Sequence, residues 1–286
     1  MSSPFADRPS IPVGPLMSIF DPVFLGIDEF GHPVYLPLIY RNILIGGEPG
    51  AGKSSLLNTI VGYAALCHDC DLVLMDGKEL EFGLWEDSAA EFVGPDLGHA
   101  IDTLERVQQM LNNRNAFLKS QRRQKIERGD TDVRPLLLAI DELAYFAASV
   151  GTKIEQEYFS ALNRDIASRG RAVGVINAAA TQRPSADIIP PSLRFLYGWR
   201  YAGRTVDDAS SDVILGQGWA SRGYSAASID PNNRGAGLLL AEEGIPNRVK
   251  AAFMTTTDII RLADYTAWIR GGAADRQLTT ELRPAA

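Results

Sequence analysis

Residues 42–55 read Asn42-Ile43-Leu44-Ile45-Gly46-Gly47-Glu48-Pro49-Gly50-Ala51-Gly52-Lys53-Ser54-Ser55. The stretch starts as a short apolar run, breaks into glycines and ends in Gly-Lys-Ser, so it matches the phosphate-loop pattern G-x-x-x-x-G-K-[ST] at every fixed position. An apolar run before the glycines and a helical pattern after them give the strand–turn–helix context that a phosphate loop requires. A plain glycine-rich turn would explain the glycines but not the complete pattern.

The residue types of this loop suit a nucleoside triphosphate with a magnesium ion. Gly47, Gly50 and Gly52 let the backbone curl so that successive N–H groups point at a phosphate. Lys53 adds a positive charge, and the Ser54 hydroxyl can ligate Mg²⁺. We therefore expect the chain to bind ATP and Mg²⁺. The expected nucleotide ligands are Gly47, Glu48, Pro49, Gly50, Ala51, Gly52, Lys53, Ser54 and Ser55.

Composition bounds the class of protein. The 286-residue length and the 45% hydrophobic content are enough for one large α/β core. No window approaches the roughly 18 uninterrupted apolar residues of a membrane helix, and residues 1–9 contain no signal-peptide apolar region. We expect a cytoplasmic location, with recruitment to the membrane by a partner. The formal charge of −7 argues against a uniformly basic nucleic-acid surface, but a channel needs positive charge only along its lining.

Apolar patterning predicts alternating strands and helices around the loop. Residues 24–27 and 33–36 read as two short strands around a turn, a hairpin that precedes the phosphate loop. Further strands are expected near residues 71–76, 136–140, 172–180, 195–202, 236–241 and 248–253, and helices after Lys53, from 101 to about 128, from 154 to about 170 and near 258–270. This alternation predicts an α/β fold with a mainly parallel sheet flanked by helices.

The two cysteines occur as Cys67-His68-Asp69-Cys70, a spacing seen in redox and metal motifs. A zinc site needs about four ligands, and the other histidines, His32 and His99, are scattered in the sequence. Two buried thiols at the end of a helix are the better interpretation.

An acidic pair, Asp141-Glu142, follows the apolar run 136–140. Ligands of open parallel sheets bind at the carboxyl ends of the strands, where this pair is expected to lie. Asp141 would hold Mg²⁺, and Glu142 would orient and polarise the attacking water. The alternative, that both residues cap the next helix, does not account for the phosphate loop upstream, so hydrolysis of ATP is the favoured chemistry.

Gln182 ends the apolar run that precedes Pro184. At the carboxyl end of a strand, its amide could contact the γ-phosphate and report its loss. A surface amide in a turn is the alternative.

Taken together, these stretches resemble the motor domain of FtsK/SpoIIIE-type DNA translocases over about residues 20–270. The matching blocks are Gly46 to Ser55, Asp76-Gly77-Lys78, Asp141-Glu142-Leu143-Ala144, Arg169-Gly170-Arg171-Ala172-Val173-Gly174 and Ala180-Thr181-Gln182-Arg183-Pro184-Ser185. The sequence is most similar to the FtsK-like transfer proteins of actinobacterial conjugative plasmids and integrative elements. That narrower likeness lies in Asp76 to Glu81, Ser210 to Gly216 and Arg234 to Gly237.

The resemblance implies a RecA-like P-loop ATPase that forms a homo-hexamer around double-stranded DNA. In such rings a neighbouring subunit completes each site, and Arg171 matches the block that would supply an arginine in trans. Lys53, Glu142, Arg171 and Gln182 are thus the expected catalytic residues, with Ser54 and Asp141 on the metal. The larger translocases carry membrane spans before the motor, so a separate membrane anchor protein is a further expected partner.

The densest basic stretch contains Arg114, Lys119, Arg122, Arg123, Lys125 and Arg128. A solvated helix face is the default interpretation. A loop that lines a channel and contacts DNA phosphates is the alternative.

The expected organisation is an irregular arm at 1–20, an ATPase domain at 21–271 that includes the hairpin at 24–36, and a flexible tail at 272–286. The expected function is ATP-driven translocation of double-stranded DNA during conjugative transfer. The family resemblance leaves protein export open as an alternative, and a nucleotide-binding switch with little turnover is disfavoured by Glu142.

Overall fold

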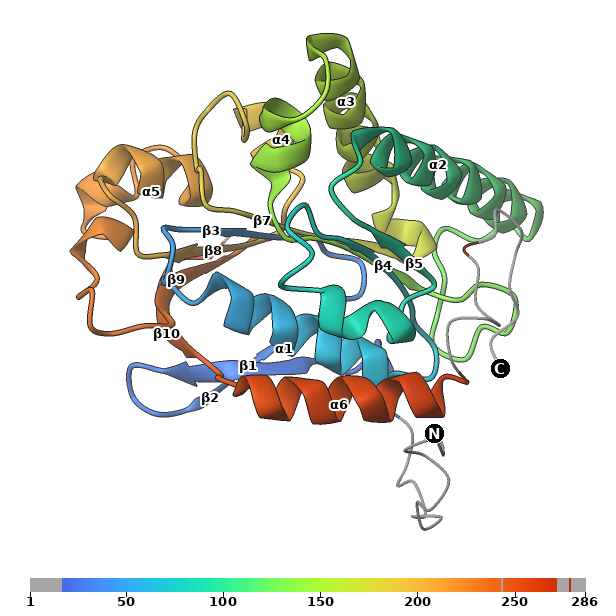
Figure 1. Ribbon diagram of the computed structural model, residues 1–286, viewed down its shortest axis with the longest axis horizontal. Helices are drawn as coiled ribbons and strands as arrows, with labels where there is room; N and C mark the ends of the chain where they lie inside the picture. The colour runs from blue at the N-terminus through green and yellow to red at the C-terminus, as the bar shows by residue number, and fades with distance from the viewer. Residues whose placement is uncertain (1–16, 243, 272–277, 279–286) are drawn as a thin grey trace, which may run out of the picture.

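The computed structural model describes residues 17–242, 244–271 and 278 (Figure 1). In this part of the chain, ten strands form one sheet in the order β2-β1-β10-β9-β8-β3-β7-β6-β4-β5. The strands are β1 (Val23–Asp28), β2 (Pro33–Leu36), β3 (Ile43–Gly46), β4 (Asp71–Met75), β5 (Glu91–Val93), β6 (Leu136–Ile140), β7 (Val175–Thr181), β8 (Trp199–Gly203), β9 (Ala236–Ala241) and β10 (Asn247–Ala251).

The sheet has a parallel half and an antiparallel half. Strands β8, β3, β7, β6, β4 and β5 run parallel to one another. Every residue of β3, β4, β6 and β7 is buried, as expected for strands covered on both faces. From β8 outward, β9, β10, β1 and β2 each pair antiparallel to the strand before them. The predicted α/β fold with its N-terminal hairpin is confirmed.

Helices cover both faces of the sheet. Figure 1 shows α1 and α6 on one face and α2, α3 and α5 on the other. The α-helices are α1 (Lys53–Leu66), α2 (Leu97–Ser120), α3 (Lys153–Arg169), α4 (Pro191–Arg194), α5 (Asp208–Leu215) and α6 (Thr256–Ile269), and the short 3₁₀ or π turns are η1 (Gly83–Ser88), η2 (Tyr145–Ser149), η3 (Arg171–Val173), η4 (Ala220–Arg222) and η5 (Ala226–Ser228).

The predicted bounds of the long helix, 101 to about 128, were wrong at both ends. Helix α2 begins at Leu97 because the Asp96 side chain caps it and accepts from the backbone N–H of His99 at 3.1 Å. The helix stops at Ser120, and Arg122 has a left-handed backbone (φ 55°) that cannot continue it. Helix α3 does end before Gly170, as predicted.

The chain just before the domain packs onto it. Ile19 is fully buried, and its backbone N–H donates to Asp69 Oδ1 at 2.9 Å. Residues 1–16 of the predicted arm lie outside the described residues, as does the predicted tail at 272–286 except Leu278, whose side chain is buried. The domain boundaries stay predictions.

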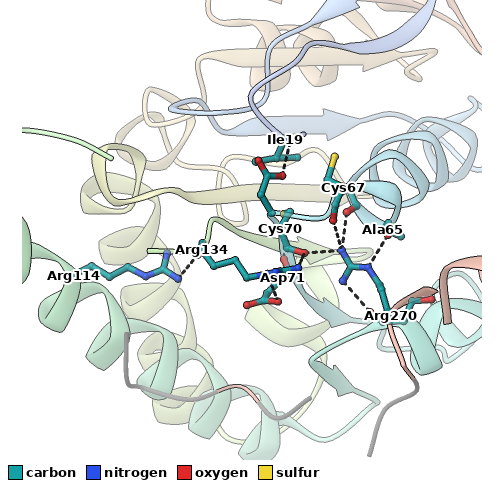
Figure 2. A network of polar contacts seen from close by, with 11 residues as sticks. Ile19, Ala65, Cys67, Cys70, Asp71, Arg114, Arg134 and Arg270 are labelled. Carbon is teal, nitrogen blue, oxygen red and sulfur yellow. Dashed lines mark hydrogen bonds and ion pairs between the residues drawn. The ribbon is translucent and has the colours of Figure 1, made fainter. Parts of the chain in front are cut away.

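A partly buried arginine network lies where β4 begins, at the amino ends of the parallel strands (Figure 2). The guanidinium of Arg270, just past α6, donates to the carbonyl oxygens of Ala65 at 2.6 Å and Cys67 at 3.1 Å. These carbonyls belong to the last turn of α1 and the residue after it, so Arg270 satisfies groups that a helix end leaves open. In the same network, Arg134 Nε lies 2.9 Å from Asp71 Oδ1.

Cys67 and Cys70 are free, buried thiols, as predicted. Burial raises the pKa of Cys67 above its ordinary range and that of Cys70 to about 12. Within the described residues, no group of histidine, cysteine and acidic side chains could hold a metal ion by itself. Both cysteines pack in the hydrophobic core as small side chains.

Candidate nucleotide-binding and hydrolysis site

The phosphate loop connects β3 to α1 at the carboxyl edge of the parallel sheet. Gly46 lies between Thr181 of β7 and Ala202 of β8, so the loop leaves the centre of the sheet. Gly50 and Gly52 have φ values of 79° and 92°, a region that side chains rarely occupy. The loop thus needs glycine for its backbone path.

Lys53 is the first residue of α1 and is almost fully buried. Its Nζ donates to the carbonyl oxygens of Gly47 and Glu48, each at 2.8 Å. Burial lowers the pKa of Lys53 to about 8, while the nearby carboxylates of Glu142 and Asp141 favour its charged form. The ammonium group therefore lies close to the acidic pair and inside the loop, where a β- or γ-phosphate would meet it.

Glu48 is bonded to the chain that follows β8. Its backbone N–H donates to Arg204 O at 2.8 Å, and its carboxylate forms an ion pair with the Arg204 guanidinium. Both groups are thereby used to attach the loop to the chain that follows β8. The N–H and carboxylate of Glu48 thus hold the loop in place, while its carbonyl oxygen accepts from Lys53.

Asp141 directly follows β6, where its backbone N–H donates to Met75 O at 3.0 Å. Its Oδ2 atom is buried and has no hydrogen-bond partner in the described residues. Burial raises the pKa of Asp141 to about 7, and the negative charges of Glu81, Asp76 and Glu142 add to the increase. An unpaired buried carboxylate oxygen next to other acidic groups suits a divalent cation, which prefers oxygen ligands, so Asp141 fits a bound Mg²⁺, and the Ser54 hydroxyl lines the nearby cleft.

Glu142 is held by three hydrogen bonds. Its Oε1 accepts from Thr181 Oγ1 at 2.6 Å and from the Ala144 backbone N–H at 3.2 Å, and its Oε2 accepts from the Gln182 backbone N–H at 2.8 Å. Two of these donors lie at the end of β7, so neighbouring strands fix the carboxylate. Sequence reasoning did not single out Thr181, although it lies inside a quoted motif.

Asp76 organises the loop that follows β4. The side chain is fully buried, and its carboxylate accepts from the backbone N–H groups of Lys78 at 2.9 Å, Glu81 at 2.8 Å and Phe82 at 2.7 Å. A carboxylate that accepts several amide bonds fixes the turn around it. This turn brings Glu81 to the nucleotide cleft.

A cleft of about 520 Å³ opens beside the loop. It is lined by Pro49, Gly50, Gly52, Lys53, Ser54, Ser55, Glu81, Gln182, Arg234, Gly235, Lys250, Ala251 and Phe253. Six of the expected nucleotide ligands thus line it together with Gln182, whereas Gly47, Glu48 and Ala51 are not among its lining residues. The volume lies within the range of about 300–1,000 Å³ that is usual for small-molecule sites.

Comparison with known proteins supplies the family. A model described as "FtsK/SpoIIIE family" matches residues 2–200. The chain belongs to the FtsK/SpoIIIE family. This is a family of ATPases, which agrees with the enzyme class expected from the phosphate loop and the acidic pair.

Relatives of this FtsK/SpoIIIE chain include two proteins named DNA translocase FtsK. The one from Treponema pallidum is 26% identical over 275 residues, which cover 86% of this chain and 32% of that protein. The one from Haemophilus influenzae is 25% identical over 280 residues, which cover 85% of this chain and 51% of that protein. The chain therefore spans about a third to a half of these relatives.

Solved structures confirm the fold of the FtsK/SpoIIIE chain. The pCW3 conjugation coupling protein TcpA, in its monomer form with ATPγS, has a TM-score of 0.73 at 19% identity, covering 89% of this chain and 72% of that one. The cytoplasmic domain of the Thermomonospora curvata type VII secretion ATPase EccC has a TM-score of 0.69 at 20% identity, covering 96% of this chain and 34% of that one. Among the helices of the described chain, none combines the length and apolar character that a bilayer span requires.

Arg171 of the FtsK/SpoIIIE chain lies away from the phosphate loop. It begins η3, ahead of β7, whereas the loop lies at the carboxyl end of that strand. At about 3.3 Å per residue, β7 alone separates the two edges by roughly 20 Å. The guanidinium donates to Tyr40 O at 2.7 Å and pairs with Glu242 at 3.1 Å. Arg171 therefore cannot reach the phosphate loop of its own chain.

The basic stretch from Arg114 to Arg128, which runs from α2 into the loop after it, is partly paired within the chain. Arg114 is buried and donates to Val173 O at 2.9 Å; burial lowers its pKa to about 10. Arg123 pairs with Asp130, and Arg128 pairs with Asp21. Of the six cations, these three serve the fold, which favours the interpretation as an ordinary surface over a DNA-contacting loop.

Proposed function

We propose that this chain is the ATP-hydrolysing motor of a system that moves double-stranded DNA during conjugative transfer of a plasmid or integrative element. The observation that carries the proposal is Glu142, held by Thr181 and Gln182 on the acidic side of a complete phosphate loop. A positioned carboxylate beside the γ-phosphate site suits water attack. The relatives named DNA translocase FtsK support DNA as the substrate.

Each side chain has a role in this proposal. The loop amides and Lys53 bind the β- and γ-phosphates, and Glu142 accepts a proton from the attacking water. Ser54 and Asp141 hold Mg²⁺, which supplies positive charge to the phosphate oxygens when bound. Gln182 lines the same cleft, where its amide would contact the γ-phosphate.

We propose a homo-hexamer as the active form. Arg171 lies at the amino ends of the parallel strands, whereas the phosphate loop lies at their carboxyl ends. Arg171 can therefore act only on the phosphate of a neighbouring subunit. To do so it must leave its ion pair with Glu242, which is partly exposed and lies at the surface. The hexamer would act in the cytoplasm. The separate membrane anchor protein stays a prediction.

Protein export is the second candidate, favoured by the structural likeness to the type VII secretion ATPase EccC. That likeness concerns the fold and leaves the substrate open. Since the phosphate chemistry would be the same, only the stimulating polymer separates the two functions.

The test is the ATPase rate of the purified oligomer with and without duplex DNA at low salt. For a DNA motor, we expect duplex to raise the turnover several-fold, and added NaCl to reduce the effect because phosphate contacts are electrostatic. Glu142→Gln is the control for contaminating ATPases, since it should bind ATP and lose at least about 100-fold in kcat. An oligomer that hydrolyses ATP at the same rate with and without duplex would contradict DNA translocation.

A further inference from the structure

The antiparallel half of the sheet supplies the second wall of the nucleotide cleft. Strand β9 begins beside the end of β8, with Gly237 opposite Gly203, and β10 returns to the same edge, with Lys250 opposite Ala236. As a result, residues 234–236 and 250–253 lie next to the phosphate loop. The approach is close, because a Cβ atom on Gly52 would lie 2.5 Å from Gly235 Cα.

Several hydrogen bonds fix this wall. Gly235 O accepts from the Ala251 backbone N–H at 2.8 Å and from Tyr201 Oη at 2.9 Å. Lys250 Nζ donates to Asn233 Oδ1 at 2.6 Å and to Arg234 O. The 233–235 turn is thereby tied to β8 and β10, so this side of the cleft is formed before any ligand binds.

Phe253 occupies the far end of the wall. It lines the cleft, yet its side chain is 77% exposed and has no aromatic or cationic ring partner in the described residues. Phe253 lies between the end of β10 and the start of α6. Thr255 and Asp258 form a capping box at the N-terminus of α6. An apolar ring left open to water beside a binding cleft is available to a ligand.

The sheet order sets the direction of a bound nucleotide. The acidic pair follows β6, which lies beyond β7 on one side of β3, whereas Phe253 follows β10, which lies beyond β8 and β9 on the other side. A phosphate loop places its lysine at the β- and γ-phosphates. With the γ-phosphate towards Asp141 and Glu142, the nucleoside leaves the loop on the side of Ser55 and Phe253.

We propose that Phe253 is the stacking face of a nucleobase subsite, so that the base of the bound nucleotide lies against its ring. The proposal rests on the nucleotide site of the proposed function and adds the group that binds its base. Stacking is tolerant of base identity, so the subsite accepts adenine and guanine nucleotides alike and excludes ligands that lack a base.

The test compares ATP with inorganic tripolyphosphate, which carries the phosphates without the nucleoside. Binding of each to the full chain is measured by calorimetry in the presence of Mg²⁺. We expect Phe253→Ala to weaken ATP and GTP binding by about 5- to 100-fold, the range for loss of one base–aromatic stack, with tripolyphosphate affinity unchanged. Phe253→Tyr should restore wild-type affinity for ATP. Phe195→Ala is the matched control, because Phe195 is also exposed, at 69%, and does not line the cleft.

Two outcomes overturn the subsite. One is unchanged ATP affinity in Phe253→Ala; the other is an equal loss for ATP and tripolyphosphate, which would mean that the substitution disturbs the phosphate loop. Lys53→Ala reports on the loop separately, since it should weaken both ligands. If Lys53→Ala binds both ligands as the wild type does, the phosphate site itself is wrong, whatever Phe253 does.

Discussion

The Thr181 hydroxyl holds the carboxylate of Glu142, the proposed catalytic base, in place. Its Oγ1 donates to Glu142 Oε1 at 2.6 Å, and both side chains are buried. Thr181→Val keeps the shape and removes the donor, so we expect kcat to fall about 10- to 100-fold, the effect of one hydrogen bond to a charged group, with ATP affinity nearly unchanged. Steady-state kinetics measure the split between kcat and KM.

Two further variants separate positioning by Thr181 from a general loss of packing. Thr181→Ser keeps the hydroxyl and should retain most of the activity. Thr103→Val removes another fully buried hydroxyl, on α2, and should leave kcat as it is. Equal kcat values for Thr181→Val and Thr181→Ser would contradict the positioning role.

We expect the charged Asp141 side chain to lower the stability of the protein at neutral pH when no cation is bound. Burial raises its folded-state pKa from 3.8 to about 7. Because the folded state then binds the proton more tightly than the unfolded state, the stabilising contribution is complete below pH 3.8 and is lost as the pH rises through 7. In EDTA, Asp141→Asn should therefore raise Tm at pH 8 by at least about 2 °C, and by clearly less at pH 5, where the folded carboxyl is still protonated.

Calorimetric melting curves at the two pH values measure this effect. Asp132→Asn, at an exposed position, is the control and should leave Tm unchanged at both. A lower Tm for Asp141→Asn at pH 8 would mean that the carboxylate stabilises the fold, contrary to its unpaired Oδ2.

The residues of the site were predictable where a contiguous motif carries them. Lys53, Ser54, Asp141 and Glu142 follow from the phosphate loop and from an acidic pair after a buried strand. The Glu48–Arg204 ion pair was not predictable, because its partners are distant in sequence and meet only when β3 and β8 pair. Phe253 lacks a sequence signal for the same reason.

Among the elements, the phosphate loop gives the sharpest comparison of two glycines. Gly50 and Gly52 both have positive φ, but a Cβ on Gly50 would meet nothing within 4 Å, whereas a Cβ on Gly52 would lie 2.5 Å from backbone. Gly50→Ala should lower the free energy of unfolding by about 1–2 kcal/mol, the cost of the backbone strain alone. Gly52→Ala adds a clash between two loops, so its unfolding free energy should be lower by at least a further ~1 kcal/mol.

Denaturant unfolding without nucleotide measures the difference between these two variants. The matched backbone conformations remove the contribution of strain from the comparison. Equal stabilities for Gly50→Ala and Gly52→Ala would mean that the 234–236 segment can move away from the loop.

Elements with long apolar runs were predictable, and short or polar ones were not. The buried strands β4 and β6 are predictable from their runs of consecutive apolar residues. Strand β5 has three residues, too few to show a period, and α5 lies in a polar stretch where the Asp207 cap, which accepts from Ser210 N–H at 2.7 Å, is the main helical signal. The predicted strand at 195–202 began too early, because residues 191–194 form α4 and β8 starts at Trp199.

On the scale of the whole molecule, the position of Arg171 predicts a site shared between subunits. Arg171→Ala and Lys53→Ala proteins should each lack ATPase activity. When they are mixed, some interfaces pair an intact phosphate loop with an intact arginine, so part of the activity should return. Steady-state rates across mixing ratios measure the rescue, and a mixture that stays inactive despite forming mixed oligomers would argue against an arginine acting in trans.

Arg270 attaches the C-terminal end of helix α1 to the chain just past α6. The N-terminal end of α1 carries Lys53 and Ser54. At the C-terminal end, the guanidinium of Arg270 donates hydrogen bonds to the carbonyl oxygens of Ala65 and Cys67. A helix of 14 residues is a stiff rod of about 21 Å. The Arg270 side chain therefore connects the chain just past α6 to the helix that begins at the phosphate loop, so α1 and α6 are coupled at the end of α1 that lies farthest from Lys53.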